Sequence, residues 1–560
     1  MKIFLSQQNY HIGNFEYNTN KIIEAIREAK KQQGDLIIFS ELCVCGYPPK
    51  DFLEFNDFIE QCQTSIDKIK EEADTIGVLI GAPYRNPNPE GKDLFNSAWL
   101  LHEKNVKGVV HKSLLPNYDI FDEYRYFEPA FEWHLLHFKG KKLAVTICED
   151  IWDLADNPLY RSRPMDILIK QHPDVMINLS ASPFDYIHAE ARKSMLKRNA
   201  GRYNIPIIYC NTTGAQTDLL FDGGSIVMNA QKDIICELPY FTESLACVHL
   251  LNDASFEEPV IVPSDEVPYE YHIPISFDAD LNIDKIHKAL LLGIKDYFSK
   301  MGFKKALVAS SGGIDSAVTI ALACEALGSE KVFALLMPSQ YSSEHSVSDA
   351  EQLSKNLNNK YETVAIKDIF AEYEEALGAV FKGLPENVTE ENLQSRIRGT
   401  LAMALCNKFG YVLLNTSNKS ELSTGYGTLY GDMAGGLSVI GDLYKMQVYA
   451  LAHYINREKE VVPKNIIDKA PSAELRPGQK DSDSLPEYDV LDPILYQYIE
   501  RHKGPKEIVD MGNDPTLVAR ILKLVNTNEY KRNQFCPIIR ISPKAFGSGR
   551  RVPIAGKYLS

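Results

Sequence analysis

The run SSGGIDS, at residues 310–316, constrains the fold of this chain more than any other segment. It follows the short apolar stretch Ala306–Ala309 and leads into the Ala- and Leu-rich stretch Ser316–Leu327. We therefore expect a strand, a tight loop and a helix in that order. Gly312 and Gly313 have no Cβ, which lets the backbone turn tightly and approach a ligand closely. Further strand–helix repeats follow, and together they predict a doubly wound sheet.

The same loop is suited to hold a phosphorylated ligand. The helix that follows it supplies free N–H groups and the positive end of its dipole, and the serines add hydroxyl donors. Asp315 would repel a phosphate, but it makes sense as a ligand of a divalent cation that bridges to the phosphates. No GxxxxGK[ST] sequence occurs, so this is not a Walker loop. The alternative is an ordinary Ser/Gly turn that caps a helix; the full run, placed between strand and helix, favours a nucleotide site.

Length and composition limit the class of protein. A chain of 560 residues should form at least two domains. Its 60 basic and 75 acidic residues give a net charge of −15, which argues against a dedicated nucleic-acid binder. There is no apolar stretch of about 18 residues, and the N-terminus turns polar too early for a signal peptide. Ten cysteines without regular spacing are typical of reduced thiols, so we expect a cytoplasmic protein without a membrane span.

The chain divides by pattern into three parts. Residues 1–250 alternate short apolar strands with amphipathic helices such as Asn18–Lys31, which predicts an α/β sandwich. Residues 251–280 are acidic and rich in proline, as expected of a linker, and residues 281–560 form the second domain. Within the latter, residues 471–492 are polar and broken by proline, so they form either a plain surface loop or a mobile lid.

Three reactive groups of the first domain each follow an apolar strand: Glu41 after LIIFS, Lys112 after VKGVVH and Cys148 after LAVTI. A carboxylate, an ammonium and a thiol suffice for amide hydrolysis if they converge at one sheet edge. The ammonium lowers the pKa of the thiol, the carboxylate accepts its proton, and the ammonium stabilises the oxyanion. Each residue alone would more often be a buried thiol or a solvated charge, so spacing alone leaves the question open.

The sequence segments around these residues decide whether they form a catalytic site. FSELCVCGYPPKD (39–51), HKSLLPNYDIFDEYRYF (111–127) and TICEDIW (146–152) closely resemble the nitrilase, or carbon-nitrogen hydrolase, superfamily. The resemblance implies an αββα sandwich in which Glu41 is the general base, Lys112 the cation on the oxyanion side and Cys148 the nucleophile that forms a thioester. It also implies that Glu123 is the accessory glutamate that orients the lysine.

Taken together, the two halves resemble the glutamine-dependent NAD⁺ synthetases. The C-terminal half carries ENLQSRIRG (391–399), NTSNKSELSTGYGTLYGDMAGG (415–436), LYKMQV (443–448) and NEYKR (528–532), each with a counterpart in that family. The resemblance implies a Rossmann-like ATP-pyrophosphatase domain that adenylates deamido-NAD⁺ with ATP and Mg²⁺. Ammonia from glutamine, released in the first domain, would then attack the acyl-adenylate to give NAD⁺ and AMP. It further implies a homo-oligomer, at least a dimer.

The resemblance also assigns binding residues by position. Glutamine would meet Tyr118, Ser182 and His188, the last standing where the family usually has Lys or Arg. Deamido-NAD⁺ would meet Asn392, Arg396, Glu421 and Lys531, and Mg²⁺ would be held by Asp315 and Glu421. The residues expected to contact ATP are Ala309, Ser310, Ser311, Gly312, Gly313, Ile314, Asp315, Ser316, Thr416, Lys445 and Ser472.

Two other functions compete with this interpretation. The first is a different ATP-pyrophosphatase amidotransferase, such as one that makes GMP or asparagine, but those families use other glutaminase domains. The second is a nitrilase-like amidase whose C-terminal half is only a regulatory nucleotide-binding domain. The additional segments ENLQSRIRG and NEYKR argue against the second.

Overall fold

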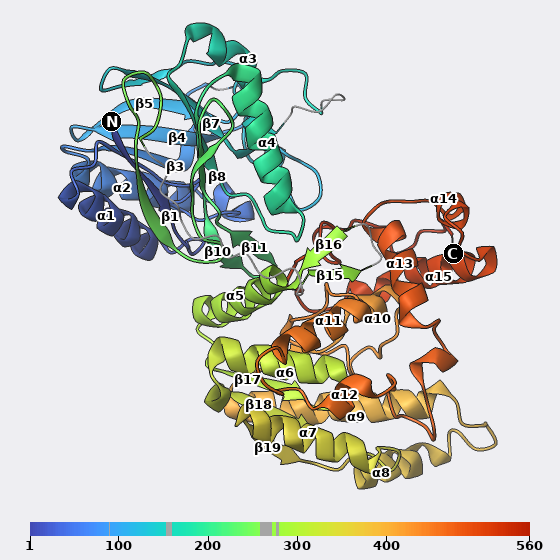
Figure 1. The fold of residues 1–560 in the computed structure, drawn as a ribbon. Coiled ribbons are helices and arrows are strands. Elements are labelled where there is room, and N and C mark those ends of the chain that lie inside the picture. Colours follow the sequence, from blue (N-terminus) through green and yellow to red (C-terminus); the bar gives the residue numbers. More distant parts are fainter. Residues whose placement is uncertain (89, 153–158, 258–271, 276–278, 560) are drawn as a thin grey trace. The chain divides into compact units, whose positions relative to one another are not determined.

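The computed structural model describes residues 1–88, 90–152, 159–257, 272–275 and 279–559. The chain divides into two compact units, Met1–Glu266 and Val267–Ser560 (Figure 1). Most of the expected linker, 251–280, lies outside the described residues. None of the described helices is long and apolar enough to cross a membrane.

Two six-stranded sheets make up most of the N-terminal unit in its described part. The first has the order β14-β1-β2-β3-β4-β5, with β1 (Lys2–Gln7), β2 (Leu36–Ile38), β3 (Gly77–Arg85), β4 (Leu94–His102), β5 (Asn105–His111) and β14 (Ser244–His249). The second has the order β13-β12-β9-β8-β7-β6, with β6 (Leu136–Phe138), β7 (Lys141–Ile147), β8 (Val175–Ser180), β9 (Ile207–Asn211), β12 (Ile226–Met228) and β13 (Ile234–Glu237). A hairpin, β10 (Thr213–Gln216) and β11 (Leu219–Asp222), stands beside them.

The two sheets face each other, and helices cover both outer faces (Figure 1). Apolar residues of both sheets, among them Leu79 and Ile177, form the inner core. Helices α1 (Phe15–Lys31) and α2 (Asn56–Glu72) cover the first sheet, and α3 (Pro164–Leu168) and α4 (His188–Tyr203) cover the second. Strands buried on both faces appear as continuous apolar runs, which explains the strand pattern. The expected αββα sandwich is confirmed.

Helix α1 begins three residues before the predicted start at Asn18. The side chain of Asn14 accepts a hydrogen bond from the backbone N–H of Tyr17 and so caps the first turn. Asparagine is among the preferred residues for this role. The cap, rather than the apolar periodicity, therefore sets the start of this helix.

The C-terminal unit contains a five-stranded parallel sheet in the order β19-β18-β17-β20-β21. Its strands are β17 (Lys305–Ala309), β18 (Val332–Leu336), β19 (Lys360–Thr363), β20 (Tyr411–Asn415) and β21 (Leu437–Ser438). The chain starts at the centre, moves outward on one side and returns to β20 on the other side. Ligands bind in such sheets where the strand order reverses, beyond the carboxyl ends of the strands. Here that point lies between β17 and β20.

Helices lie on both faces of this sheet (Figure 1). One face carries α5 (Ile283–Met301), α6 (Ile314–Leu327) and α11 (Lys445–Ile455), and the other α8 (Lys367–Gly378) and α9 (Val388–Phe409). The expected doubly wound sheet is confirmed. The remaining elements are β15 (His272–Ile275), β16 (Ala279–Asn282), α7 (Glu344–Leu357), α10 (Lys419–Thr424), α12 (Lys464–Asp468), α13 (Tyr488–Ile499), α14 (Pro505–Asp510), α15 (Pro515–Thr527) and α16 (Glu529–Arg532). Short 3₁₀ helices are η1 (Lys50–Glu54), η2 (Glu123–Arg125), η3 (Cys148–Ile151), η4 (Ile169–Gln171), η6 (Ser329–Lys331) and η7 (Asp481–Asp483).

Candidate active sites

Lys112 is the centre of a buried ion cluster in the N-terminal unit. Its side chain has no exposed surface, and Nζ lies 2.7 Å from Oε1 of Glu41 and 2.8 Å from both carboxylate oxygens of Glu123. Burial alone would lower the pKa of Lys112, but the two carboxylates outweigh burial and raise it well above its usual value. The lysine is therefore a charged ammonium held between two carboxylates.

Further donors surround these carboxylates. The hydroxyl of Tyr47 donates to Oε1 of Glu123 at 2.8 Å, and the backbone N–H of Ala181, just beyond β8, donates to Oε2 of Glu41 at 3.0 Å. The side-chain amide of Asn96 on β4 donates to Oε1 of Glu41 at 2.7 Å. These donors come from both sheets, since Asn96 lies on β4 of the first sheet and Ala181 directly follows β8 of the second.

Cys148 is the first residue of η3 and directly follows the last residue of β7. Its φ of +41° is left-handed, and only 5% of the residue is exposed. Backbone strain at non-glycine residues concentrates at functional sites. Burial, followed by the charge of Glu41, raises the pKa of the thiol well above its usual value, while Lys112 opposes this in part. The thiol is therefore protonated at neutral pH, and it needs a base to take its proton when it reacts.

Asp150 fixes the relative position of two of the strand ends. Its Oδ1 accepts hydrogen bonds from the backbone N–H groups of Ser113 and Leu114 at 3.0 and 2.9 Å, and its Oδ2 accepts from Ile147 at 3.0 Å. Strand β5 belongs to one sheet and β7 to the other, so this carboxylate ties the two sheets together where the ammonium and the thiol emerge. Burial raises the pKa of Asp150 to about 6.

The residues predicted to contact glutamine lie in two small groups. The hydroxyl of Tyr118 donates to the Glu149 carboxylate at 3.0 Å. In the second group, the Ser182 hydroxyl and Nε2 of His188 are 2.8 Å apart, and the His188 ring stacks on Trp152 with 4.9 Å between ring centres. Each group offers polar atoms beside the segment that carries the thiol. Their contacts with glutamine stay predictions.

Sequence reasoning did not single out Glu149. It directly follows Cys148, is buried, and has a pKa raised by burial to about 7. A carboxyl that titrates near neutral pH beside a nucleophile is a strong candidate for a functional residue. The sequence did contain a signal for this residue, the acidic pair Glu149–Asp150 within TICEDIW. Two adjacent acids close to the end of a buried apolar strand are not typical of a solvent-exposed run of charges.

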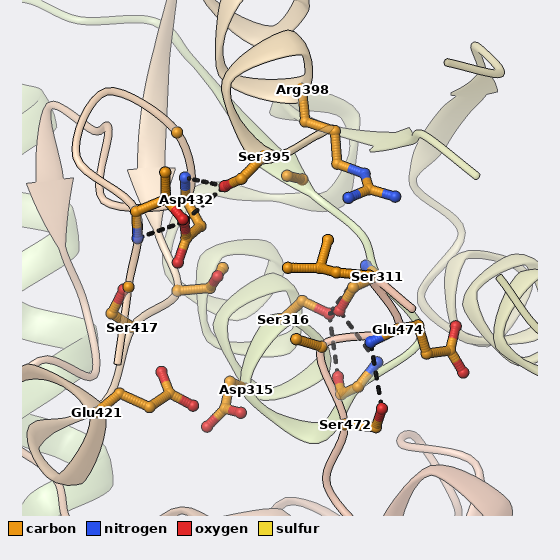
Figure 2. A pocket seen from close by; sticks show the side chains of 18 of the residues that line it. Ser311, Asp315, Ser316, Ser395, Arg398, Ser417, Glu421, Asp432, Ser472 and Glu474 are labelled. Carbon is orange, nitrogen blue, oxygen red and sulfur yellow. Dashed lines mark hydrogen bonds between the residues drawn. The ribbon is translucent and has the colours of Figure 1, made fainter. Parts of the chain in front are cut away.

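A cavity of about 670 Å³ lies at the switch point of the C-terminal unit (Figure 2). It opens beyond β17 and β20, where doubly wound sheets bind ligands. Its wall includes most of the residues that the sequence predicted for this half: Ala309, Ser310, Ser311, Gly313, Ile314, Asp315, Ser316, Asn392, Thr416, Glu421, Lys445, Ser472 and Lys531. Gly312 and Arg396 are not among the lining residues.

Gly312 has a structural reason to be glycine. Its φ is +78°, and a Cβ at this position would lie 2.2 Å from the backbone oxygen of Ser346. The loop therefore packs directly on the first turn of α7, which leaves its neighbours facing the cavity. Among these, the hydroxyl of Ser310 is buried and has no hydrogen-bond partner within the described protein. A buried hydroxyl without a partner calls for a ligand or water to satisfy it.

Asp315 and Glu421 lie side by side in this cavity (Figure 2). Asp315 is held by Asn418, whose Nδ2 donates to Oδ1 at 3.0 Å. Burial, and then the charge of Asp315, raises the pKa of Glu421 well above its usual value, although Lys445 lies 3.7 Å away. Magnesium is usually bound through one or two carboxylates together with substrate phosphates, so this pair suits that ion.

Other predicted residues shape the far wall of the cavity. The ammonium of Lys531 donates to the backbone oxygens of Gly425 and Gly427 at 2.7 and 2.8 Å, and burial lowers its pKa. Oδ1 of Asn392 accepts from the hydroxyl of Thr428 at 2.7 Å. These contacts brace the loop 425–428, so both side chains position the wall as well as line it.

The segment 471–492 forms another wall, although its last residues already belong to α13. Ser472 donates to the backbone oxygen of Gln479 at 2.5 Å, which folds the loop back on itself. Glu474 accepts hydrogen bonds from the hydroxyls of Ser343 and Ser346 at 3.0 and 2.8 Å and pairs with Lys469 at 2.6 Å. The loop is therefore anchored to the first turn of α7.

Sequence reasoning also passed over Arg398. This arginine of α9 lines the cavity, whereas Arg396 is exposed and donates to the backbone oxygen of Leu429 at 3.3 Å. Nε of Arg398 donates to the backbone oxygen of Met337 at 2.9 Å, just beyond β18. Burial lowers the pKa of Arg398 to about 10. Its guanidinium extends from α9 toward the Glu474 loop (Figure 2).

Behind the cavity, Lys419 has no exposed surface. Its ammonium pairs with Asp442 at 2.9 Å and with Glu500 at 2.6 Å, and it donates to the Ser542 hydroxyl at 2.8 Å and to the backbone oxygen of Lys544 at 3.0 Å. Burial would lower the pKa of this lysine, but the two carboxylates raise it. The charge is thus fully compensated, as a buried ion requires. Lys419 opens α10, the helix that carries Glu421.

Comparisons with known proteins match both units. The carbon-nitrogen hydrolase family model matches residues 2–253, and the NAD synthase model matches residues 286–535. A glutamine-dependent NAD(+) synthetase from a Synechocystis species is 44% identical and aligns over 99% of both chains. One from Thermotoga maritima is 39% identical over 100% of this chain and 99% of its own. The chain belongs to the glutamine-dependent NAD(+) synthetase family.

A solved structure agrees with this membership. The glutamine-dependent NAD⁺ synthetase from Acinetobacter baumannii, determined in complex with ADP, is 37% identical, with a TM-score of 0.77. The match covers 99% of this chain and 98% of that one. As a member of this family, the chain is expected to carry one reactive site in each unit, and each unit contains one cluster or cavity of the required chemistry. The individual residue roles stay predictions.

Proposed function

We propose that this protein makes NAD⁺ from deamido-NAD⁺, with ATP as the activating co-substrate and glutamine as the nitrogen donor. The products besides NAD⁺ are AMP, diphosphate and glutamate. One observation carries the proposal: a buried thiol–carboxylate–ammonium cluster and a phosphate-loop cavity occur in one chain of the glutamine-dependent NAD(+) synthetase family. Ammonia production and carboxylate activation are the two chemistries that such a reaction needs.

In the N-terminal site, the Cys148 sulfur attacks the side-chain carbonyl carbon of glutamine. Glu41 accepts the thiol proton, and Lys112 stabilises the negative charge that develops on the carbonyl oxygen. The proton then passes to the leaving nitrogen, ammonia departs, and a thioester remains. Water cleaves the thioester, which releases glutamate and restores the thiol. Glu123 keeps Lys112 oriented throughout because it accepts with both oxygens.

In the C-terminal site, an oxygen of the nicotinate carboxylate attacks the α-phosphorus of ATP, and diphosphate leaves. The resulting mixed anhydride has a good leaving group, so ammonia can attack its carbonyl carbon and expel AMP. The loop 310–316 and the first turn of α6 present N–H groups and hydroxyls for the phosphates. Lys445 adds a charge that can move from Asp315 to a phosphate oxygen.

Mg²⁺ completes this proposal. Asp315 and Glu421 would hold the ion, and the ion would neutralise charge on the phosphates. The protein residues around it keep the two carboxylates in place: Asn418 holds Asp315, and Lys445 lies between the two acids.

Two properties of the whole molecule are also part of the proposal. We place the protein in the cytoplasm because all ten cysteines are free thiols, as expected of a reducing compartment. We also expect a homo-oligomer, at least a dimer, since the segment between α8 and α9 exposes the apolar side chains of Val380 and Leu384. Light scattering coupled to size-exclusion chromatography tests the second statement.

The deciding assay supplies deamido-NAD⁺, ATP, Mg²⁺ and glutamine and measures NAD⁺, AMP and glutamate. We expect NAD⁺ and AMP to appear in equal amounts, and NAD⁺ also to form when ammonium replaces glutamine. Glutamate release without ATP-dependent NAD⁺ would instead support an amidase with a regulatory nucleotide-binding domain.

A further inference from the structure

Asn96 touches all three charged members of the N-terminal cluster. It lies on β4, between β3 and the edge strand β5 of the first sheet, and has no exposed surface. The amide Nδ2 donates to Oε1 of Glu41 at 2.7 Å and reaches Oε2 of Glu123 at 3.4 Å. Its backbone oxygen accepts from the backbone N–H of Lys112 at 2.8 Å. No other described residue donates to both carboxylates except the lysine itself.

Chemistry fixes the orientation of this amide. Ionised carboxylates only accept hydrogen bonds, so the NH₂ group must face them. The carbonyl Oδ1 of Asn96 then points elsewhere, and it has no hydrogen-bond partner within the described protein. A buried acceptor left without a partner weakens folding. An apolar side chain at this position would not leave an acceptor unpaired and would avoid this loss of folding free energy. The presence of asparagine therefore indicates that its two hydrogen bonds to the carboxylates serve a function.

The charge balance explains what those bonds do. Two carboxylates share one ammonium, which leaves one uncompensated negative charge in a buried site. Burial raises the pKa of Glu123, and the neighbouring Glu41 adds to this while Lys112 opposes it. Neutral donors that bind a carboxylate favour its ionised form without adding charge. Asn96 is such a donor, and it bridges the two acids at the place where they face one another.

We propose that Asn96 is a positioning residue for glutamine hydrolysis, which holds Glu41 apart from Glu123 and keeps Glu41 able to accept the proton of Cys148. Asn96 acts through Glu41 and does not itself exchange a proton. The proposal rests on the glutaminase half of the proposed function. It goes beyond the carboxylate, lysine and thiol because it adds a neutral group on which the basicity of the site depends.

Two substitutions test this role. Asn96→Leu has nearly the same shape but no donor, and Asn96→Asp places a third carboxylate between the other two. We measure glutamate release as a function of pH, together with NAD⁺ synthesis from ammonium. Both variants should move the acid limb of kcat/KM to higher pH, Asn96→Asp further than Asn96→Leu. At pH 7, kcat should fall at least about tenfold, because a positioned general base contributes roughly 10²–10⁴-fold. KM for glutamine should stay within about twofold, since uniform binding is untouched.

The neighbouring residue provides a matched control. Ser97 is equally buried on the same strand, but its hydroxyl contacts the His111 ring at 2.6 Å and none of the three charged groups. Ser97→Ala should lower thermal stability without moving the acid limb. An Asn96 variant that loses activity with an unmoved acid limb would show a structural role only and overturn the proposal. If Asn96→Leu does not fold, Asn96→Asp decides alone, because it keeps the side-chain shape.

The failure of this proposal is distinguishable from failure of the proposed function. If the wild-type protein releases no glutamate from glutamine, the glutaminase assignment falls. If the wild type releases glutamate and both Asn96 variants keep its pH profile, only the role of Asn96 falls. NAD⁺ synthesis from ammonium should be the same in the wild type and in both variants, since the second site lies in the other unit. A parallel loss there would overturn the assignment to glutamine hydrolysis.

Discussion

Nζ of Lys445 lies 2.5 Å from Oδ2 of Asp315, so the first residue of α11 is paired with the second residue of α6. Burial would lower the pKa of Lys445, but Asp315 and Glu421 raise it. The lysine is therefore charged and acts as the internal counter-ion of the two acids. If Asp315 binds Mg²⁺ as proposed, Lys445 is the cation that would be left to pair with a phosphate oxygen.

This pair leads to the first prediction. Asp315→Asn should lower NAD⁺ synthesis at least about a hundredfold with either nitrogen donor, because charge stabilisation in a closed site typically contributes that much. Glutamate release from glutamine should persist, since the thiol site belongs to the other unit. Parallel assays of NAD⁺ and glutamate check this. Undiminished NAD⁺ synthesis would contradict the role of Asp315.

The thiol gives the converse prediction. Cys148→Ala should abolish NAD⁺ synthesis from glutamine but retain synthesis from ammonium, because only ammonia production needs the sulfur. The measurement is NAD⁺ formation with each donor at saturating ATP and deamido-NAD⁺. Equal loss with both donors would show that the two sites are not separable in this way.

Glu149 predicts a pH dependence. Burial raises its pKa to about 7, so the carboxyl is neutral below that pH and charged above it. Glutamine carries an α-ammonium, and an anion beside Cys148 would attract it. KM for glutamine should therefore fall as the pH rises from 6 to 8 in the wild type, whereas Glu149→Gln should show a nearly flat profile. A variant with the wild-type profile would assign the titration to another group.

Gly312 offers a steric test. Gly312→Ala places a Cβ 2.2 Å from the Ser346 oxygen at a left-handed φ, so the loop must shift away from α7. We expect KM for ATP to rise at least about tenfold, as a displacement near 1 Å can cost up to 10²-fold. Gly313→Ala is the control, because its Cβ would lie 3.3 Å from the Ser311 hydroxyl and its φ is not left-handed. Equal effects of the two substitutions would refute the steric argument.

Arg398 supplies the last prediction. It stands beside Met337 at the carboxyl end of β18, and its remaining donors line the cavity. An arginine can both stack on a base and donate to phosphate or ribose. Arg398→Met should raise KM for ATP about tenfold and leave glutamate release unchanged. Arg396→Met, two residues away on the exposed side, should change KM for ATP much less.

The two arginines show what sequence patterns can and cannot provide. The segment ENLQSRIRG correctly indicated that this part of the chain lines the nucleotide cavity. Side chains two residues apart on a helix, however, point in nearly opposite directions. Only one of them can face the cavity, and the pattern alone does not say which. By contrast, β17, its loop and α6 were predicted within about two residues, because glycines and hydroxyls must stand at fixed offsets there.

Other differences arise from long-range contacts. The bridging position of Asn96 depends on where β2 and η2 come to lie, and neither is near it in sequence. The sequence did not show whether residues 471–492 form a surface loop or a lid. What anchors this segment is a long-range contact, in which Glu474 accepts hydrogen bonds from Ser343 and Ser346 at the start of α7. Hydrophobic periodicity predicts strands but carries no information on such long-range pairs. The Glu41–Lys112–Glu123 group was expected from the family resemblance alone, whereas the bridging role of Asn96 was not expected at all.

The partners of Lys419 have a consequence for how the protein is made. Its ammonium is satisfied by Asp442 and Glu500, and then by Ser542 and Lys544 much later in the chain. While these two residues are still inside the ribosome, the ammonium at the start of α10 has its carboxylate partners but lacks two of its hydrogen-bond acceptors. Helix α10, which carries Glu421, therefore gains the last contacts of its first residue only after residue 544 has left the ribosome, later than the contacts with Asp442 and Glu500.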